Sequence, residues 1–199
     1  MSIHMPANRK TNTGKLIIGC LTMVLGVFAL MHSIDAQNAH ASTPMAAASA
    51  MRVAFSPGDG DGTAQQLVID EVGKANKQIL VAAYEFTSAP IARAIVDAKN
   101  RGVDVKAVLD RTQAKEGYSA AKFLADAGIE VRIDYVPAIM HDKFLCIDGA
   151  TLETGSFNYT TSAAKRNAEN AIAIDDPQLV VRYANEWLRL WQESQPYGS

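Results

Sequence analysis

A histidine and a lysine stand two positions apart in the segment 141–148, whose pattern is H-x-K-x-x-x-x-D. Residues 141–147 have the composition of a strand, and side chains two residues apart on a strand leave from the same face. An imidazole that can attack phosphorus and a fixed ammonium beside it suit the cleavage of a phosphodiester. Such chemistry usually needs a second proton-transfer group. Of the four histidines, only His141 lies beyond position 40, so the rest of the chain supplies no second imidazole.

Many enzymes that cleave phosphodiesters neutralise the phosphate oxygens with metal ions held by carboxylate and histidine clusters. The sequence indicates no such cluster, because one histidine and one cysteine in an apolar run make a poor ligand set. We therefore expect no metal and no other cofactor. Lys143 and Asn158, the latter in the loop 155–158, are the candidates to hold the anionic oxygens. The run 59–62, Asp-Gly-Asp-Gly, lacks the other ligands of a calcium loop and is interpreted as a turn.

Residues 1–41 have the pattern of a secretory signal peptide. Three basic residues precede an apolar run at 16–31, and Ala39-His40-Ala41 follows as a small-residue cleavage pattern. The run is shorter than the roughly 18 apolar residues of a membrane span, and retention as an anchor is the alternative. We expect a signal at 1–41, a flexible leader at 42–51 and one domain at 52–199. The mature chain is then periplasmic or secreted by a bacterium, without stable membrane insertion.

Composition restricts the class of partner. Removal of the signal takes away three of the 19 basic and one of the 21 acidic residues, which leaves 16 basic and 20 acidic residues. A net negative charge is not the footprint of a basic surface that binds nucleic acid, so phosphate recognition must come from locally placed cations. Cys146 remains after Cys20 is removed, and its apolar neighbours indicate a buried thiol, since it has no disulfide partner.

Runs with strand character alternate with helical patterns after residue 50. Strands are predicted at 51–55, 78–84, 104–109, 130–134, 141–147, 151–154 and 168–174. Helices are predicted at 90–100 and 119–127. Two more helices are predicted to begin at the capping pattern 63–66 and at residue 177. This order predicts an α/β fold, an α-β-α sandwich around a mostly parallel mixed sheet. Asp148-Gly149 is the turn signal of a hairpin. The spacing of Trp187 and Trp191 among aliphatic residues favours packing over stacking on bases.

The segment 141–148, followed by Gly155-Ser156-x-Asn158, resembles the catalytic signature of the phospholipase D superfamily. Residues 52–195 as a whole are similar to the small single-motif bacterial endonucleases of that superfamily. The resemblance implies the phospholipase D-like fold and a role for each matching residue. His141 would be the nucleophile that forms a phosphohistidine, and Lys143 and Asn158 would hold phosphate oxygens. Ser156 would be a supporting hydrogen-bond donor.

Further residues receive roles from the same reasoning. Glu169 matches the carboxylate with which the family orients its histidine, and an acid in an otherwise apolar strand needs a partner. Asp148 lies an odd number of residues from Lys143, so a regular strand directs it away from the active face, and we expect a structural hydrogen-bonder at the turn. Lys165 and Arg166 are candidates to bind further phosphates, with ordinary solvated charges as the alternative.

Long members of the superfamily carry two copies of the motif, in which one histidine attacks and the other protonates the leaving group. This chain has one copy, so we expect a homodimer in which two His141 side chains meet at a two-fold axis. We expect a metal-independent, non-specific endonuclease that acts on DNA, with RNA as a further substrate, because no base-reading module is apparent. A phospholipase acting on lipid headgroups is the alternative. A non-enzymatic phosphate-binding adaptor is a third interpretation, against which the intact set of site residues argues.

Overall fold

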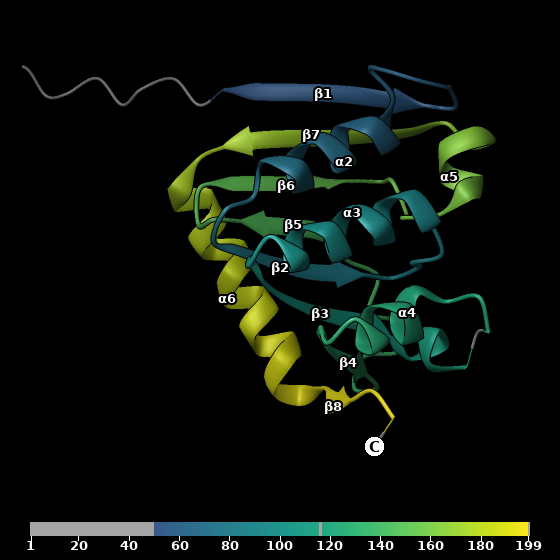
Figure 1. Cartoon of the computed structure of the whole chain (residues 1–199), viewed down its shortest axis with the longest axis vertical. Coiled ribbons are helices and arrows are strands. Elements are labelled where there is room, and N and C mark those ends of the chain that lie inside the picture. The colour runs from purple at the N-terminus through teal and green to yellow at the C-terminus, as the bar shows by residue number, and fades with distance from the viewer. Residues whose placement is uncertain (1–49, 116, 199) are drawn as a thin grey trace, which may run out of the picture. The chain divides into compact units, whose positions relative to one another are not determined.

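The structure is a computed structural model that describes residues 50–115 and 117–198 (Figure 1). The predicted signal at 1–41 and the predicted leader up to residue 49 lie outside the described residues. The first strand, β1 (Met51–Ser56), begins where the predicted leader ends. Met51 belongs to the fold rather than to the leader, because its backbone pairs with Ile174 of the sheet.

A single eight-stranded sheet organises the fold, with the order β1-β7-β6-β5-β2-β3-β4-β8 across its width. After β1, the strands are Gln78–Ala83 (β2), Asp104–Asp110 (β3), Glu130–Asp134 (β4), Lys143–Ile147 (β5), Thr151–Gly155 (β6), Glu169–Asp175 (β7) and Gln195–Pro196 (β8). The predicted strands agree with these bounds to within one residue, except that β5 begins two residues later than predicted. β8 has only two residues and shows no strand pattern in the sequence.

The sheet is mixed as predicted, but the prediction that it is mostly parallel is wrong. In the described chain β2, β3 and β4 are parallel neighbours, and the other five neighbouring pairs are antiparallel. Parallel neighbours need a crossover, which the helices α3 (Ala89–Asn100) and α4 (Ala120–Asp126) supply. After β4 the chain instead forms the hairpin β5–β6, and β1 joins the sheet at the far edge beside β7.

Helices cover both faces of the sheet, which confirms the predicted α-β-α sandwich (Figure 1). α2 (Ala64–Lys74), α3 and α4 pack on one face and α6 (Pro177–Glu193) packs on the other, while α5 (Thr161–Lys165) and a 3-10 helix (Arg111–Ala114) lie in connections. Ile79 and Val81 of β2 belong to the core beneath α2 and α3, whereas Leu80 and Ala82 belong to the core beneath α6. β2 is therefore buried on both faces, which explains its continuous apolar run.

The tryptophan pair anchors α6. Trp187 is 4 % exposed, its Nε1 donates to the Val81 carbonyl at 2.8 Å, and its ring stacks on Trp191 with centroids 4.8 Å apart. These contacts confirm the predicted packing role. Cys146 is also buried, and burial raises the pKa of its thiol to about 12, which confirms the prediction of a buried thiol.

Asp148 holds the turn between β5 and β6 against the start of β2. Asp148 and Gly149 have φ angles of 55° and 69°, as a tight hairpin turn requires. The Asp148 carboxylate accepts the backbone N–H groups of residues 76–78 at 2.8 to 2.9 Å. Burial opposes ionisation, but these three donors outweigh it and keep the pKa of Asp148 below its ordinary value. Asp148 thus lies at the end of β5 that is farther from His141.

A neutral carboxyl group is buried on β6. Glu153 is 1 % exposed, and the Tyr159 hydroxyl donates to its Oε2 at 2.7 Å. Burial raises the pKa of Glu153 to about 8 against the opposing effect of the Tyr159 bond, and the charge of Glu71 raises it further. At neutral pH the Glu153 carboxyl is therefore largely protonated in the folded protein, whereas it is ionised in the unfolded chain.

We expect Glu153→Gln to raise the free energy of unfolding at pH 8, relative to the wild type, and to change it much less at pH 5. A carboxyl with a raised pKa in the folded state contributes its full stability below the ordinary pKa of 4.5 and loses it as the pH rises toward 8. Urea unfolding at the two pH values measures this difference. Tyr159→Phe is the control, because loss of the donor should destabilise the protein at both pH values. An equal effect of Glu153→Gln at pH 5 and pH 8 would contradict a buried neutral carboxyl.

Candidate active site

His141 lies immediately before β5, at the point where the chain enters the sheet. Lys143 is the first residue of β5, so His141 and Asp142 lie before the strand, although the sequence predicts a strand over 141–147. The pairing with β2 continues beyond the strand end, because the Tyr84 N–H donates to the Asp142 carbonyl at 2.9 Å. His141 is exposed, whereas Lys143 is buried with 8 % of its surface exposed. An accessible imidazole thus stands next to a cation with a fixed position.

The Lys143 side chain bends back onto His141. Its Nζ lies 3.0 Å from the His141 Nδ1 and also donates to the His141 carbonyl. The same ammonium lies 5.1 Å from the centroid of the Tyr84 ring, and that ring centroid is 4.5 Å from the imidazole centroid. The structure therefore brings together the two residues that the motif pairs, and it adds Tyr84 as a neighbour of both.

Burial and nearby carboxylates act on Lys143 in opposite directions. Burial lowers the pKa of Lys143 below its ordinary value, and the charges of Asp142, Glu85 and Glu169 oppose this shift. An ammonium in such surroundings is poorly hydrated, so it has a strong tendency to bind an anion that enters the site. A phosphate oxygen is an anion of this kind.

A pocket of about 250 Å³ adjoins the His141–Lys143 pair. Its lining comes from the start of β5, the end of β6 and α6: His141, Asp142, Lys143, Phe144, Thr154, Gly155, Ser156 and Tyr183. The Tyr183 ring of α6 meets the Phe144 ring edge-on at 5.1 Å and closes one side. The remaining lining is mostly polar or charged, so the pocket suits a phosphate group.

Ser156 and Glu169 meet where β6 ends and β7 begins. The Ser156 hydroxyl donates to the Glu169 Oε2 at 2.6 Å and accepts the Asn170 N–H at 3.1 Å. The Asn167 side-chain amide donates to the other Glu169 oxygen at 3.0 Å. No hydrogen bond joins Glu169 to His141 in the described part of the chain, so orientation of the histidine by Glu169 stays a prediction.

Asn158 is held by an acid that the sequence reasoning missed. The Asn158 Nδ2 donates to the Glu85 Oε2 at 3.3 Å, and the Asn158 Oδ1 is buried without a hydrogen-bond partner. Buried polar atoms are normally satisfied, so this amide is arranged for a further contact. Glu85 follows β2 by two residues at the carboxyl end of the strand, where site residues of α/β sheets gather. That position was the available signal for both Glu85 and Tyr84.

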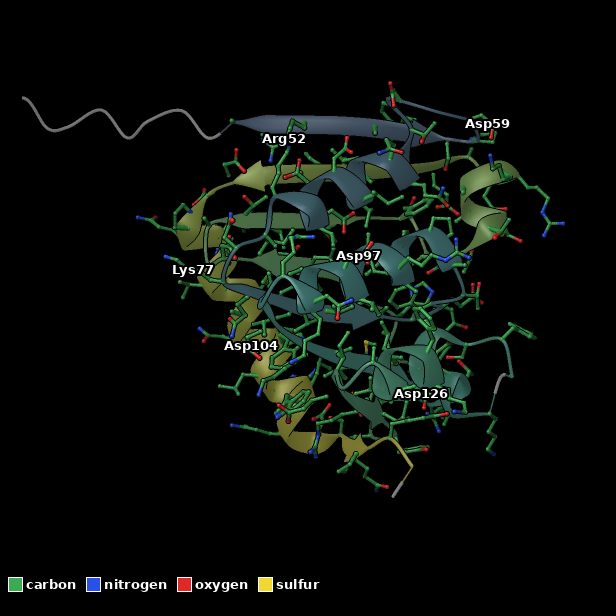
Figure 2. All side chains as sticks on the ribbon, in the orientation of Figure 1. Arg52, Asp59, Lys77, Asp97, Asp104 and Asp126 are labelled. Carbon is green, nitrogen blue, oxygen red and sulfur yellow. The ribbon has the colours of Figure 1, made fainter. Side chains whose placement is uncertain are left out.

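Lys165 and Arg166 lie at the end of α5 and do not line the pocket around His141. The Lys165 ammonium forms an ion pair with Asp59, which Figure 2 shows in the loop after β1 near α5. The Arg166 guanidinium donates to the Ser162 hydroxyl. Binding of further phosphates by the two cations stays a prediction.

No group of three or more His, Cys, Asp or Glu side chains in residues 50–115 and 117–198 is arranged to hold a metal ion. None of the helices in the same residues is long and apolar enough to cross a membrane.

Known proteins resemble this chain in sequence and in fold. The family described as "Cardiolipin synthase, PLD-like domain" matches residues 68–191, which include His141 and Lys143. A phospholipase D from Rickettsia bellii is 36 % identical over 84 % of this chain and 82 % of its own length. A mitochondrial cardiolipin hydrolase from Xenopus tropicalis is 35 % identical over 62 % of this chain and 59 % of its own length. Nuc from Salmonella typhimurium, a phospholipase D family member with a crystal structure, is 38 % identical in sequence to this chain. The two structures superpose with a TM-score of 0.72, over 76 % of this chain and 99 % of Nuc. The chain therefore belongs to the phospholipase D superfamily, as a hydrolase.

Proposed function

We propose that the chain is a metal-independent phosphodiesterase that cleaves DNA, and also RNA, through a phosphohistidine at His141. The observation that carries the proposal is the contact of an exposed imidazole with a buried ammonium, 3.0 Å apart, beside a pocket whose lining residues are mostly polar or charged. A fixed ammonium can neutralise the phosphate oxygens, and the imidazole can supply the nucleophile. The Asn158 Nδ2 has a second N–H besides the one that it donates to Glu85, and this N–H can donate to those oxygens.

Substrate would prepare the nucleophile by displacing it from the lysine. While Lys143 is charged, the His141 Nδ1 accepts a hydrogen bond from its ammonium. The ring proton of a neutral imidazole is then on Nε2. A charged phosphate oxygen attracts the ammonium more strongly than a neutral ring nitrogen does, because the acceptor then carries a charge as well as the donor. An incoming phosphodiester therefore draws the ammonium to itself and frees the imidazole lone pair.

The reaction then needs a second proton-transfer group. Attack by the freed nitrogen forms an N–P bond and breaks the P–O bond to the leaving group, which takes a proton from a general acid and departs as an alcohol. A water molecule, deprotonated by that same group, next attacks phosphorus and breaks the N–P bond, which restores His141. Since the chain has no other histidine beyond position 40, we assign this role to His141 of the partner subunit in a homodimer.

An uncovered apolar face of the sheet supports the homodimer. Met51, Val53 and Phe55 of β1 are 65 %, 55 % and 66 % exposed, although all three are large apolar side chains. Ile172 and Ile174 of β7 are opposite two of them in the antiparallel register and so share their face. A contiguous exposed apolar face of this kind is typical of an interaction surface.

This face continues to the catalytic pocket. Phe144 and Thr154 of the pocket are cross-strand partners, Thr154 pairs with Ile172, and Ile172 pairs with Val53. Opposed residues of antiparallel strands point to the same face, so a second copy that covers Val53 would also cover Thr154 and approach the pocket that His141 lines. An isologous contact there can bring two imidazoles to one axis.

The lining of the pocket favours nucleic acid as the substrate. The apolar side chains that line it, Phe144 and Tyr183, pack against each other, and most of the other lining residues are polar or charged. Contacts to phosphate alone carry no sequence information. We therefore infer cleavage without sequence preference.

A phospholipase is the second candidate, and one feature favours it. Tyr135, Val136 and Ile139 are 42 %, 65 % and 53 % exposed in the segment that leads directly to His141. Apolar side chains beside an active site suit contact with a lipid surface. The names of the Rickettsia and Xenopus relatives also refer to lipid substrates.

Two substrates, each tested with excess chelator, separate these functions. We expect plasmid DNA to be degraded in the presence of the chelator, because the proposed mechanism uses fixed cations instead of a metal. Vesicles that contain cardiolipin and phosphatidylcholine should yield neither free choline nor phosphatidic acid. Headgroup release without DNA cleavage would assign the phospholipase function. Inactivity on both substrates would leave the phosphate-binding adaptor.

Substitutions of His141 and of Lys143 should distinguish the role of the nucleophile from the role of the stabilising cation. We expect His141→Asn to lower DNA cleavage by about 10³-fold or more and to abolish the trapped phosphoenzyme, since no nucleophile remains. Lys143→Ala should lower kcat/KM by about 10² to 10³-fold, the usual effect of removing one oxyanion donor. Quenched-flow assays with a labelled oligonucleotide measure both effects. Near wild-type cleavage by His141→Asn would refute the mechanism.

Disruption of the apolar face should remove the general acid. Val53→Asp is expected to give a folded monomer whose cleavage rate is about 10² to 10⁴-fold lower, the usual contribution of general acid catalysis. Sedimentation velocity and cleavage assays on the same sample test this. Leu188→Asp on α6, where Leu188 is 47 % exposed, is the matched control and should stay dimeric and active. A monomeric Val53→Asp protein with full activity would exclude the shared site.

A further inference from the structure

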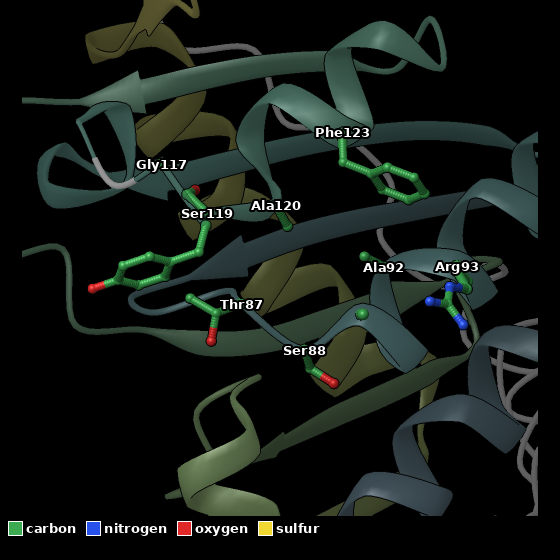
Figure 3. A pocket seen from close by; sticks show the side chains of 10 residues that line it. Thr87, Ser88, Ala92, Arg93, Gly117, Ser119, Ala120 and Phe123 are labelled. Atoms are coloured by element: carbon green, nitrogen blue, oxygen red, sulfur yellow. The ribbon is translucent and has the colours of Figure 1, made fainter.

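A second cavity lies between α3 and α4, on the face of the sheet opposite α6 (Figure 3). It has a volume of about 320 Å³, and its lining includes Thr87, Ser88, Arg93, Tyr118, Ser119 and Phe123. We call it the α3–α4 cleft. In Figure 3 the Phe123 ring and the Arg93 side chain project from the two helices toward the space between them. No residue of the mechanism proposed above lines this cleft.

The cleft combines exposed aromatic rings with a cation. Tyr118 is 74 % exposed and Phe123 is 47 % exposed. Arg93 is exposed and forms no ion pair with another described residue. Ring faces that stack on bases, together with a guanidinium that binds phosphate, are the groups with which proteins hold single-stranded nucleic acid. They fit a nucleotide better than an acyl chain.

The segment 84–88 links the cleft to the catalytic pocket. Its first residue, Tyr84, packs against His141, and its last two residues, Thr87 and Ser88, line the cleft. A span of four residues is at most about 14 Å long. A nucleic acid strand covers that distance in about four nucleotides at roughly 3.4 Å each. A strand whose scissile phosphate is at His141 can therefore reach the cleft with a flanking nucleotide.

Hydrogen bonds fix this segment in place. The N–H groups of Thr87 and Ser88 both donate to the Tyr159 carbonyl, at 2.9 and 2.8 Å, and the first N–H of α4 donates to the carbonyl of residue 86 at 2.8 Å. Tyr159 directly follows Asn158, so the cleft and the candidate phosphate-binding loop share one frame. Walls that are already ordered reduce the entropy that a ligand must lose on binding.

We propose that the α3–α4 cleft binds a nucleobase of the strand that flanks the scissile phosphodiester, with Phe123 and Tyr118 stacking on the base and Arg93 pairing with a neighbouring phosphate. This inference rests on the proposed nuclease function and gives it a substrate subsite. Stacking tolerates every base, because every base has a π face. The subsite therefore adds affinity without adding sequence preference.

Kinetics on two substrates test the cleft. One is an octanucleotide with a single native phosphodiester among phosphorothioate linkages, and the other is bis(4-nitrophenyl) phosphate, which has no nucleobase. We expect Phe123→Ala and Tyr118→Leu to raise KM for the octanucleotide about 5- to 150-fold, which corresponds to the roughly 1 to 3 kcal/mol of one stacked base. Hydrolysis of bis(4-nitrophenyl) phosphate should not change.

Three further variants separate stacking from charge and from general loss of apolar surface. Tyr118→Phe keeps the ring and should keep the wild-type KM. Arg93→Gln should raise KM and reduce its dependence on salt, because one phosphate contact is lost. Leu188→Ala removes a side chain from the opposite face that is 47 % exposed, like that of Phe123. This variant should keep the wild-type kinetics on both substrates.

The outcomes distinguish failure of the cleft from failure of the nuclease function. If Phe123→Ala and Tyr118→Leu keep the wild-type KM, the proposed role of the cleft is wrong and the proposed nuclease function is unaffected. An equal loss on bis(4-nitrophenyl) phosphate also overturns it, since the substitutions then act on the catalytic pocket. If the wild-type protein does not cleave DNA, both proposals fall. Headgroup release that Phe123→Ala weakens would then assign the cleft to lipid.

Discussion

The end of one strand satisfies two opposed requirements of the site. In the proposed mechanism a nucleophile must reach solvent, and a cation that takes the place of a metal must hold a fixed position. Because β5 begins at Lys143, the sheet buries the lysine and leaves His141 outside the regular ladder. The buried ammonium needs an acceptor and finds it 3.0 Å away on the imidazole.

Topology then gathers the other candidate residues at that strand end. β2 and β5 are antiparallel, so the carboxyl end of β2, with Tyr84 and Glu85, lies beside the amino end of β5. The hairpin returns the chain along β6, which brings the loop 155–158 to the same edge. Asp148 fixes the distant end of that hairpin through three backbone N–H groups, so its carboxylate supports the site without touching it.

Local patterns predicted more of this protein than non-local ones did. The turn at Asp148 and the proximity of Lys143 to His141 depend on near neighbours in sequence, and both are present in the structure. Strand order depends on which distant segments pair, and here the prediction of a mostly parallel sheet failed. Glu85 was missed for the same reason, since it meets Asn158 only through the pairing of distant segments. The partners of Glu169 were likewise not visible in the pattern of β7.

The proposed dimer and the class of substrate depend on each other. The His141–Lys143 chemistry is the same for a nucleic acid and a phospholipid, because both are phosphodiesters, so the surroundings must select between them. Two exposed apolar surfaces border the site, the β1 face around Val53 and the segment 135–139. A two-fold interface that covered both would remove the surface that a lipid could contact and leave polar groups and the α3–α4 cleft to the substrate. An interface on the β1 face alone would leave 135–139 free to meet a bilayer. In the proposed dimer the extent of that interface, more than the catalytic residues, would therefore decide between nuclease and phospholipase.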